Sequence, residues 1–261
     1  MKRPRVETNC KTCKKLKTNN MAKSKKKVET VVTTVTTETT TTTTVATTVS
    51  KPKPTQMIVI LDRSGSMQSI GQATVDGLNT LIREQKGAEG EAYLTLVQFD
   101  DQYQIDYKSK PIAEVQELVY METFKPRGMT AMYDAIGKTI AEIDTTDDVV
   151  LVIVTDGMEN ASREYTQTSI FETIEAKKKA GWNVLFLAAN QDAMKTGGTI
   201  GVSANNSMTF NANAGSVNAS YQNISSKMSY YRSSKLSADF GKHAGSAAFD
   251  FNDQDRKDIN K

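Results

Sequence analysis

Cysteine and histidine are scarce in this chain of 261 residues, which contains two cysteines, Cys10 and Cys13, and one histidine, His243. The two cysteines have the spacing of half a zinc site, but the chain cannot supply the ligands that would complete a four-ligand site. They are therefore either incidental thiols or part of a site shared between chains. Two cysteines also exclude a framework of several disulfides, which favours an intracellular protein.

Long apolar runs are absent as well. No stretch approaches the ~20 apolar residues that a membrane-spanning helix needs. The first five residues, Met-Lys-Arg-Pro-Arg, carry positive charge, but no apolar segment follows them, so a secretory signal peptide is not expected. The sequence therefore predicts a soluble, cytoplasmic protein. Met21 precedes a lysine-rich run and is a plausible alternative start, in which case Cys10 and Cys13 would be missing from the mature chain.

The net charge of +3 hides an uneven distribution. Residues 1–55 contain 13 Lys and Arg against 3 Asp and Glu, a net charge of +10, which leaves the remainder with 20 basic and 27 acidic residues, a net charge of −7. Such a basic segment attracts polyanions through counterion release. It lacks the aromatic side chains that stack on bases, so weak, non-specific contact with a polyanion is expected, and a solubilising linker is the alternative.

Residues 1–54 are expected to form a disordered arm and linker. Thr dominates residues 30–50 without a clean period of two, and Lys51-Pro52-Lys53-Pro54 is typical of a stiff spacer. We expect a folded domain over residues 55–236. The last segment, residues 237–261, contains Asp250, Asp253, Asp255 and Asp258 and is predicted to be a flexible, solvated tail.

Two buried strands that each end at a carboxylate stand out in the predicted domain. The apolar run Met57 to Leu61 stops at Asp62, and the run from Val149 stops at Asp156. Uninterrupted apolar runs of this length are typical of parallel strands covered on both faces. Because open α/β sheets bind ligands at the carboxyl ends of their strands, we expect the oxygens at these two ends to lie close together.

The remaining elements alternate between strand and helix. Strands are predicted around residues 57–61, 94–99, 103–107, 149–155, 184–189 and 208–210. Helices are predicted from after Ser66 to about Gly87, from Thr130 to about Ile143, over 166–180 and over 216–236, with a short helix over 110–119. Alternating strands and helices imply right-handed crossovers. The predicted fold class is therefore α/β, a doubly wound, mostly parallel sheet of the Rossmann-like kind, flanked by helices.

Three separate pieces of sequence together match one family motif. They are Asp62-x-Ser64-x-Ser66, then Thr130 in the loop that opens a helix, then Asp156 followed by Gly157. This combination resembles the von Willebrand factor A (VWA) domain family and its metal-ion-dependent adhesion site. The resemblance covers roughly residues 55–236. It implies an interaction module, and the lack of disulfide pairs favours the intracellular bacterial or phage members over the adhesive extracellular ones.

The five oxygen-bearing residues set the chemistry that the motif allows. Two carboxylates and three hydroxyls form a hard, oxygen-only ligand set that suits Mg²⁺, with Mn²⁺ or Ca²⁺ as alternatives, and does not suit zinc or copper. The resemblance implies that the Ser and Thr hydroxyls bind the ion directly and that the two Asp often act through water. With only two formal negative charges, such an ion stays electrophilic enough to accept a carboxylate from a partner protein.

Enzymatic alternatives fit the residues less well. A phosphatase with Asp62 as nucleophile would need a carboxylic acid two residues on, where this chain has Ser64, a hydroxyl that cannot act as general acid near neutral pH. A serine hydrolase would need a base beside Ser64 or Ser66, and His243 lies in the predicted tail. We therefore expect a protein without catalytic activity. A metal-independent scaffold or assembly component with the same fold remains the alternative.

Overall fold

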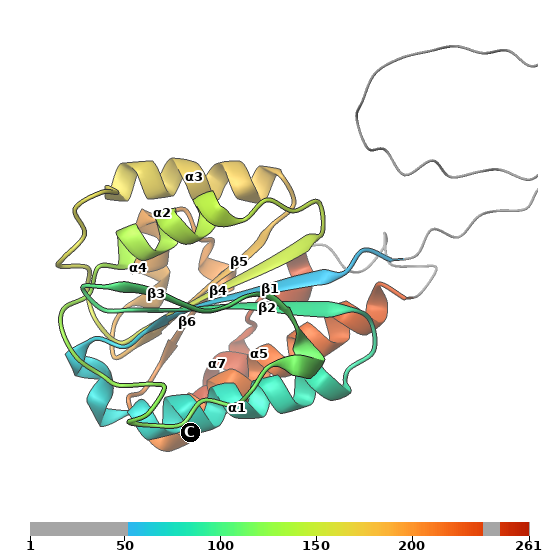
Figure 1. Ribbon diagram of the computed structural model, residues 1–261, viewed down its shortest axis with the longest axis horizontal. Coiled ribbons are helices and arrows are strands. Elements are labelled where there is room, and N and C mark those ends of the chain that lie inside the picture. The colour runs from blue at the N-terminus through green and yellow to red at the C-terminus, as the bar shows by residue number, and fades with distance from the viewer. Residues whose placement is uncertain (1–51, 237–245, 261) are drawn as a thin grey trace, which may run out of the picture. The chain divides into compact units, whose positions relative to one another are not determined.

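The central sheet has six strands and the order β3-β2-β1-β4-β5-β6 (Figure 1). The computed structural model describes residues 52–236 and 246–260. The strands are β1 (Thr55–Asp62), β2 (Ala92–Phe99), β3 (Tyr103–Pro111), β4 (Asp148–Thr155), β5 (Asn183–Ala189) and β6 (Ser207–Phe210). All neighbouring pairs are parallel except β2 and β3, which form an antiparallel hairpin at one edge. The predicted α/β class is thus confirmed.

Helices cover both faces of the sheet. The α-helices are α1 (Gly71–Gly87), α2 (Met132–Glu142), α3 (Gln167–Lys179), α4 (Ala193–Thr199), α5 (Ala214–Ser234) and α7 (Asp253–Ile259). Short 3-10 turns are η1 (Gly65–Ser69), η2 (Ile112–Glu114), η3 (Ala204–Asn206) and η4 (Ser246–Phe249). In Figure 1, α2 and α3 lie above the sheet, and α1, α5 and α7 lie below it.

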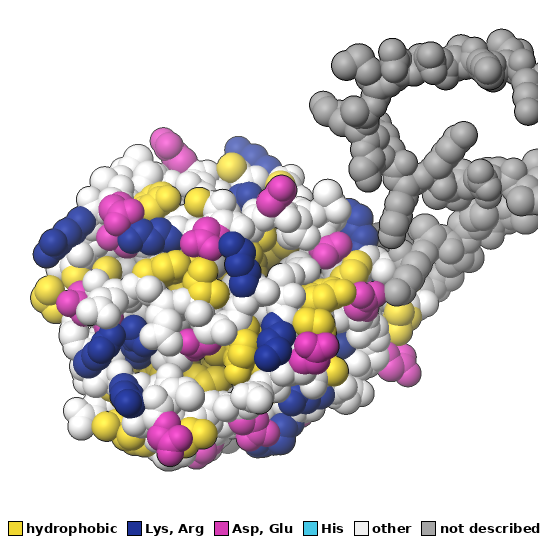
Figure 2. Space-filling model, in the orientation of Figure 1, with side chains coloured by type: hydrophobic (Ala, Val, Ile, Leu, Met, Phe, Trp, Pro, Cys, Tyr) yellow, Lys and Arg dark blue, Asp and Glu magenta, His cyan; other side chains and the backbone are white. Residues whose placement is uncertain are grey.

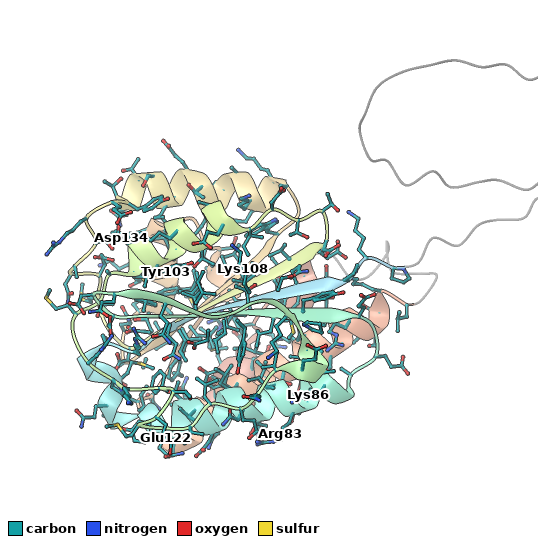
Figure 3. The ribbon with its side chains drawn as sticks, viewed as in Figure 1. Arg83, Lys86, Tyr103, Lys108, Glu122 and Asp134 are labelled. Carbon is teal, nitrogen blue, oxygen red and sulfur yellow. The ribbon has the colours of Figure 1, made fainter. Side chains whose placement is uncertain are left out.

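Successive residues of the central strands enter two separate cores, which explains their unbroken apolar runs. Met57, Val59 and Leu61 of β1 pack with α1 and α5, whereas Ile58 and Ile60 pack with α2 and α3. A strand with both faces buried has no solvent side on which to carry polar residues. Figure 3 shows the side chains on the two sides of the sheet, with Asp134 on the α2 side and Glu122 on the α1 side.

The short helix predicted over residues 110–119 is wrong. The structure has only the turn η2 there, and the chain then runs extended across α1. Asn79 of α1 causes this, because its side chain both accepts a hydrogen bond from the Leu118 amide and donates one to the Leu118 carbonyl, each at 2.8 Å. Val115 and Leu118 are buried against α1 in this extended form, so their spacing of three residues reflects packing on α1 and not a helix.

The prediction of a solvated tail over 237–261 is wrong for residues 246–260. Phe249, Phe251 and Ile259 are buried in the core beside α5. A salt bridge of 2.9 Å between Lys227 and Asp255 ties α7 to α5. The folded part therefore extends beyond residue 236. The charged residues between these three apolar side chains obscured the pattern, because the apolar spacing matches neither a regular helix nor a strand.

Several predictions fall on residues that the structure does not describe. The arm up to residue 51 with Cys10, Cys13 and Met21 lies outside the described residues, as does His243. Pro54, at the end of the predicted linker, accepts a hydrogen bond from the Asp148 amide at 3.2 Å. None of the described helices is both long and apolar enough to cross a bilayer.

Candidate metal centre

Neighbouring parallel strands place Asp62 and Asp156 at the same edge of the sheet. Asp62 is the last residue of β1, Leu61 is paired with Val154 of β4, and Asp156 directly follows β4. The hydroxyl of Thr155 donates a hydrogen bond of 2.6 Å to Asp62 Oδ2. The two carboxylates are thus joined through one residue of β4, at the carboxyl end where the sequence predicted them.

The loop after β1 brings the two serines to the same place. The Ser64 amide donates to Asp62 Oδ1 at 2.6 Å, which bends the chain back over the strand end. The hydroxyls of Ser64 and Ser66 lie 3.0 Å apart, and Ser66 Oγ donates to Asp156 Oδ1 at 2.5 Å. Asp62 and Ser64 are buried, whereas Ser66 is exposed, so the cluster has a closed floor and an open side.

Gly157 shows that Thr130 joins this cluster. A methyl group built on the Gly157 Cα would lie 2.9 Å from Thr130 Oγ1, 3.4 Å from Ser66 Oγ and 3.7 Å from Asp62 Oδ2. Oxygens from the first two parts of the motif therefore converge beside a backbone carbon of the third part. A side chain at residue 157 would fill the space between them, which is a physical reason for glycine at this position.

Thr130 is positioned by hydrogen bonds of its backbone, so its hydroxyl is not needed to hold the loop in place. Its amide donates to Asn160 Oδ1 at 2.9 Å, and its carbonyl accepts from the amides of Asn160 and Ala161. Within the described chain, Thr130 Oγ1 makes no hydrogen bond. The helix α2 begins only at Met132, where Glu159 accepts from the Tyr133 amide, so Thr130 does not cap it.

Asp100 joins the three loops around the cluster. Its Oδ2 accepts from Arg63 Nε at 3.1 Å and from Arg127 Nε at 2.8 Å, and its Oδ1 accepts from the Gln102 amide. The Asp100 carbonyl accepts from the Ala131 amide, and the Arg127 amide donates to the Arg63 carbonyl. The buried Asp100 thus fixes the Ser64 loop against the Thr130 loop.

Gly128 completes this loop contact. Its carbonyl accepts from the Gly65 amide at 3.2 Å, and its φ of +67° lies in the left-handed region that favours glycine. A β-carbon at this position would also meet the Asp101 side chain. The turn before Thr130 therefore depends on glycine.

The electrostatics of the cluster favour a bound cation. Burial raises the pKa of Asp62 from 3.8 to about 6, although hydrogen bonds from Thr155 and Ser64 oppose the shift, and the charge of Asp156 adds to it. Burial likewise raises the pKa of Asp156, against the hydrogen bond from Ser66. A positive charge between the two carboxylates would stabilise their ionised forms.

The ligand chemistry of the cluster fits a hard divalent ion. All five groups are oxygens, of which three are neutral. Among the described residues, no group of three or more His, Cys, Asp and Glu side chains offers a metal site. The five residues therefore differ from a zinc centre and match the oxygen-rich, low-charge set that Mg²⁺ accepts.

Three supporting residues were missed in the sequence. Asp62 is the last residue of β1 and Asp100 directly follows β2, so the same rule of carboxylates at strand ends could have found Asp100. Thr155 could have been found as the residue before Asp156. Asn160 carries no such signal, because an Asn in a loop is ordinary turn chemistry.

Solved structures with the same fold include two pilus proteins and a mussel byssus protein. The pilus adhesin SpaC from Lactobacillus rhamnosus GG has a TM-score of 0.56 and 14% identity over 69% of this chain and 30% of its own. Proximal thread matrix protein 1 from the mussel byssus has a TM-score of 0.52 and 14% identity over 68% of this chain and 46% of its own. The vWF domain of the pilus tip protein Mfa5 from Porphyromonas gingivalis has a TM-score of 0.51 and 11% identity over 70% of this chain and 97% of its own. At these identities the likeness shows the fold alone.

The first two of these proteins are much longer than the region that matches, since this chain spans less than half of either one. No curated protein matches the sequence. The family model of the von Willebrand factor type A domain, however, matches residues 56–226, which is more than half of the chain and includes all five clustered residues. The chain therefore belongs to the von Willebrand factor type A domain family.

Proposed function

We propose that this protein is a metal-dependent protein-binding module. Its ion is Mg²⁺, with Mn²⁺ or Ca²⁺ as alternatives, and its ligands are Asp62, Ser64, Ser66, Thr130 and Asp156. The observation that carries the proposal is the convergence of the motif oxygens around Gly157. Membership of the VWA family supports an interaction module over an enzyme.

The five proposed ligands form a site with a buried floor and a side that is open to solvent. Asp62, Ser64 and Thr130 are buried and oriented by hydrogen bonds from neighbouring loops, so they form a preorganised floor. Ser66 is exposed and Asp156 is half-buried, so a partner approaches from their side. A bound divalent ion would supply an electrophilic position that accepts an acidic side chain of the partner protein.

The surroundings of Asp62 argue against catalysis by this residue. It is 0% exposed, and its two oxygens accept hydrogen bonds from the Ser64 amide and the Thr155 hydroxyl. A nucleophile must reach its substrate, and these contacts leave Asp62 enclosed. Its environment suits a residue that orients the site, which supports the proposal of a binding protein.

One observation favours the alternative, a metal-independent scaffold. Ser64, Ser66 and Asp156 already form a continuous hydrogen-bonded chain, which satisfies these groups without an ion. A scaffold needs nothing more from them. The Thr130 hydroxyl, however, makes no hydrogen bond within the described chain, and a role as metal ligand accounts for it where a scaffold does not.

Calorimetric titration with Mg²⁺ and with Mn²⁺ tests the proposal. Asp156→Ala removes one of two negative charges and Thr130→Ala removes a neutral ligand, so we expect both to weaken metal binding, Asp156→Ala more. The fold should survive both changes, at a cost of about 0.5 to 3 kcal/mol. Glu172→Ala, an exposed charge on α3, is the control and should bind metal like the wild type.

Equal metal affinity in all four proteins would contradict the proposed metal site and would favour the metal-independent scaffold. The partner is tested separately by capture from the source cells with Mg²⁺ present. We expect a chelator to release the partner without unfolding the domain, whereas retention of the partner would contradict a metal-dependent contact. Fractionation of the same cells tests the cytoplasmic, intracellular setting, which stays a prediction.

A further inference from the structure

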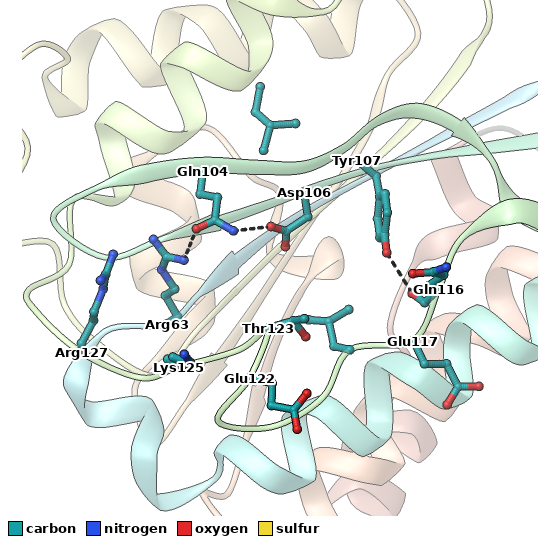
Figure 4. Close-up of a pocket in the computed structure, with 12 residues that line it drawn as sticks. Arg63, Gln104, Asp106, Tyr107, Gln116, Glu117, Glu122, Thr123, Lys125 and Arg127 are labelled. Atoms are coloured by element: carbon teal, nitrogen blue, oxygen red, sulfur yellow. Dashed lines mark hydrogen bonds between the residues drawn. The ribbon is translucent and has the colours of Figure 1, made fainter.

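A groove of about 590 Å³ opens between the edge strand β3 and the extended segment that leads to Thr130. Figure 4 shows its walls, with Gln104 to Tyr107 of β3 on one side and residues 116–127 on the other. Its volume lies within the range of ligand sites, about 300 to 1,000 Å³. The five clustered residues of the candidate metal centre do not line it.

Charges along the groove are separated. Arg63, Lys125 and Arg127 lie at one end, while Glu117 and Glu122 lie toward the other (Figure 4). Asp106 lies between them, and its carboxylate accepts hydrogen bonds from the side-chain amides of Gln98 and Gln104. Figure 2 shows Lys and Arg side chains interspersed with Asp and Glu side chains over this face of the molecule. Glu117 is paired with Arg83, but Lys125 and Glu122 make no side-chain hydrogen bond or salt bridge within the described chain. The groove thus offers an unpaired cation and an unpaired carboxylate.

The cationic end keeps capacity to bind an anion. Asp100 accepts from both Arg63 and Arg127, so one buried carboxylate faces two guanidinium groups. The Arg127 side chain is 53% exposed, and its Nη1 makes no hydrogen bond within the described residues. Asp101 also lies close enough to Arg127 to act on its charge, so Arg63, Arg127 and Lys125 face two carboxylates at this end. The one positive charge that remains would be balanced by a carboxylate of a ligand.

The wall made by β3 is suited to a peptide. β3 is at the edge of the sheet, paired only with β2 among the described strands, so its other side has no strand partner. An extended peptide can hydrogen-bond to such an edge while its side chains enter flanking pockets. The β3 residues that line the groove, 104–107, match about four residues of an extended chain, or about 13 Å.

We propose that this groove binds an extended peptide segment of another protein, which lies along β3 with an acidic side chain at Lys125 and Arg127. A basic side chain of the same segment faces Glu122. We choose a peptide with separated charges as the occupant because it can pair with the free edge of β3 and place opposite charges at the two ends of the groove. The site needs no metal ion, so it can act independently of the function proposed above.

Selection from a displayed library of random peptides, against the full chain and in the presence of a chelator, tests this site. We expect enriched peptides that share an acidic residue and bind Lys125→Glu at least tenfold more weakly than the wild type. Lys179→Glu, the same charge change on α3, should bind them like the wild type. Amide resonances of Gln104 to Tyr107 should shift on titration with an enriched peptide.

Reversing the charge on both the peptide and Lys125 tests whether the two groups contact each other directly. A peptide whose acidic residue is changed to Lys should lose affinity for the wild type and regain it for Lys125→Glu. The proposal is overturned if no peptide is enriched, if enriched peptides bind Lys125→Glu and the wild type equally, or if their resonance shifts lie away from β3. The basic arm is present in every variant, so its binding to acidic peptides cannot produce the expected difference.

Discussion

At the scale of single residues, the burial of Asp62 links the stability of this protein to pH and, through the proposed metal site, to a bound cation. Between its ordinary pKa of 3.8 and its folded pKa of about 6, the folded chain holds a proton that the unfolded chain has released. The free energy of unfolding contributed by this group therefore falls as pH rises through that window. Above about pH 6 the buried carboxylate is ionised and destabilising unless a cation balances it.

This linkage predicts a metal effect that grows with pH. We expect millimolar Mg²⁺ to raise the melting temperature more at about pH 8 than at about pH 5, because protons compete with the ion at the lower pH. Thermal unfolding at both pH values, with Mg²⁺ or with chelator, measures the difference. Equal shifts at the two pH values would contradict an ionised Asp62 beside the metal.

Asp100 is a second residue whose substitution should affect both the stability of the domain and the proposed metal site. Asp100→Asn removes the charge that pairs with Arg63 and Arg127, and we expect a loss of about 3 kcal/mol because the buried Arg63 guanidinium loses its carboxylate partner and keeps only the neutral Gln104. Metal affinity should fall as well, since the two loops lose their common anchor. Asp101→Asn, the exposed neighbour, is the control.

Chemical unfolding and calorimetry of the two variants separate these effects. The expected result is a large change in stability and in Mg²⁺ affinity for Asp100→Asn and a change within about 0.5 kcal/mol for Asp101→Asn. If Asp100→Asn lost stability but kept full metal affinity, Asp100 would support the fold without positioning the site.

At the scale of elements, the segment 246–260 belongs to the folded domain. Phe249 is 0% exposed, and its ring centroid lies 5.0 Å from that of Tyr231 on α5. Phe249→Ala should therefore cost about 3 to 5 kcal/mol, the usual range for a buried phenylalanine. Phe171→Ala on α3, where the side chain is 43% exposed, should cost much less.

Denaturant unfolding of these two variants is the measurement. If Phe249→Ala were as stable as Phe171→Ala, segment 246–260 would not be packed on the domain, and the sequence-based prediction of a solvated tail would hold.

Buried Arg232 of α5 makes a second long-range contact, because it donates to the carbonyls of Gln85, Ala88 and Gly90 at the end of α1. Long-range contacts of this kind leave no local trace in sequence.

At the scale of the whole molecule, the basic arm is predicted to be separable from the domain. A chain that starts at Lys53 keeps the bond from Lys53 Nζ to the Thr146 carbonyl and all of β1. Its free energy of unfolding should match that of the full chain within about 0.5 kcal/mol. Weak binding to a labelled duplex at moderate salt should disappear with the arm.

Melting curves and duplex titration of the two chains test this. A chain starting at Met57 is the control, because it loses the bonds that Thr55 makes with Glu91 and Lys235 and should be less stable. A large loss of stability on removal of residues 1–52 would show that the arm joins the fold. Duplex binding that survives the removal would place the nucleic-acid contact on the domain.

The sequence by itself determined the central sheet and the position of the candidate metal centre. Strands buried on both faces must be apolar throughout, and residues 57–61 and 149–155 show this without any knowledge of their neighbours. Because parallel strands end at one edge, the oxygens after β1 and β4 had to meet there. The motif then added Thr130 from a separate loop.

Only the tertiary structure decided how that edge is held and where the domain ends. The anchors of the site, Asp100 and Asn160, act across 27 to 37 residues of chain, so no local pattern distinguishes them from turn residues. Leu118 is extended because Asn79 clamps its backbone, and Phe249 is buried because α5 lies beside it. Local propensity describes what a segment prefers alone, whereas these residues follow contacts that exist only after the chain has folded.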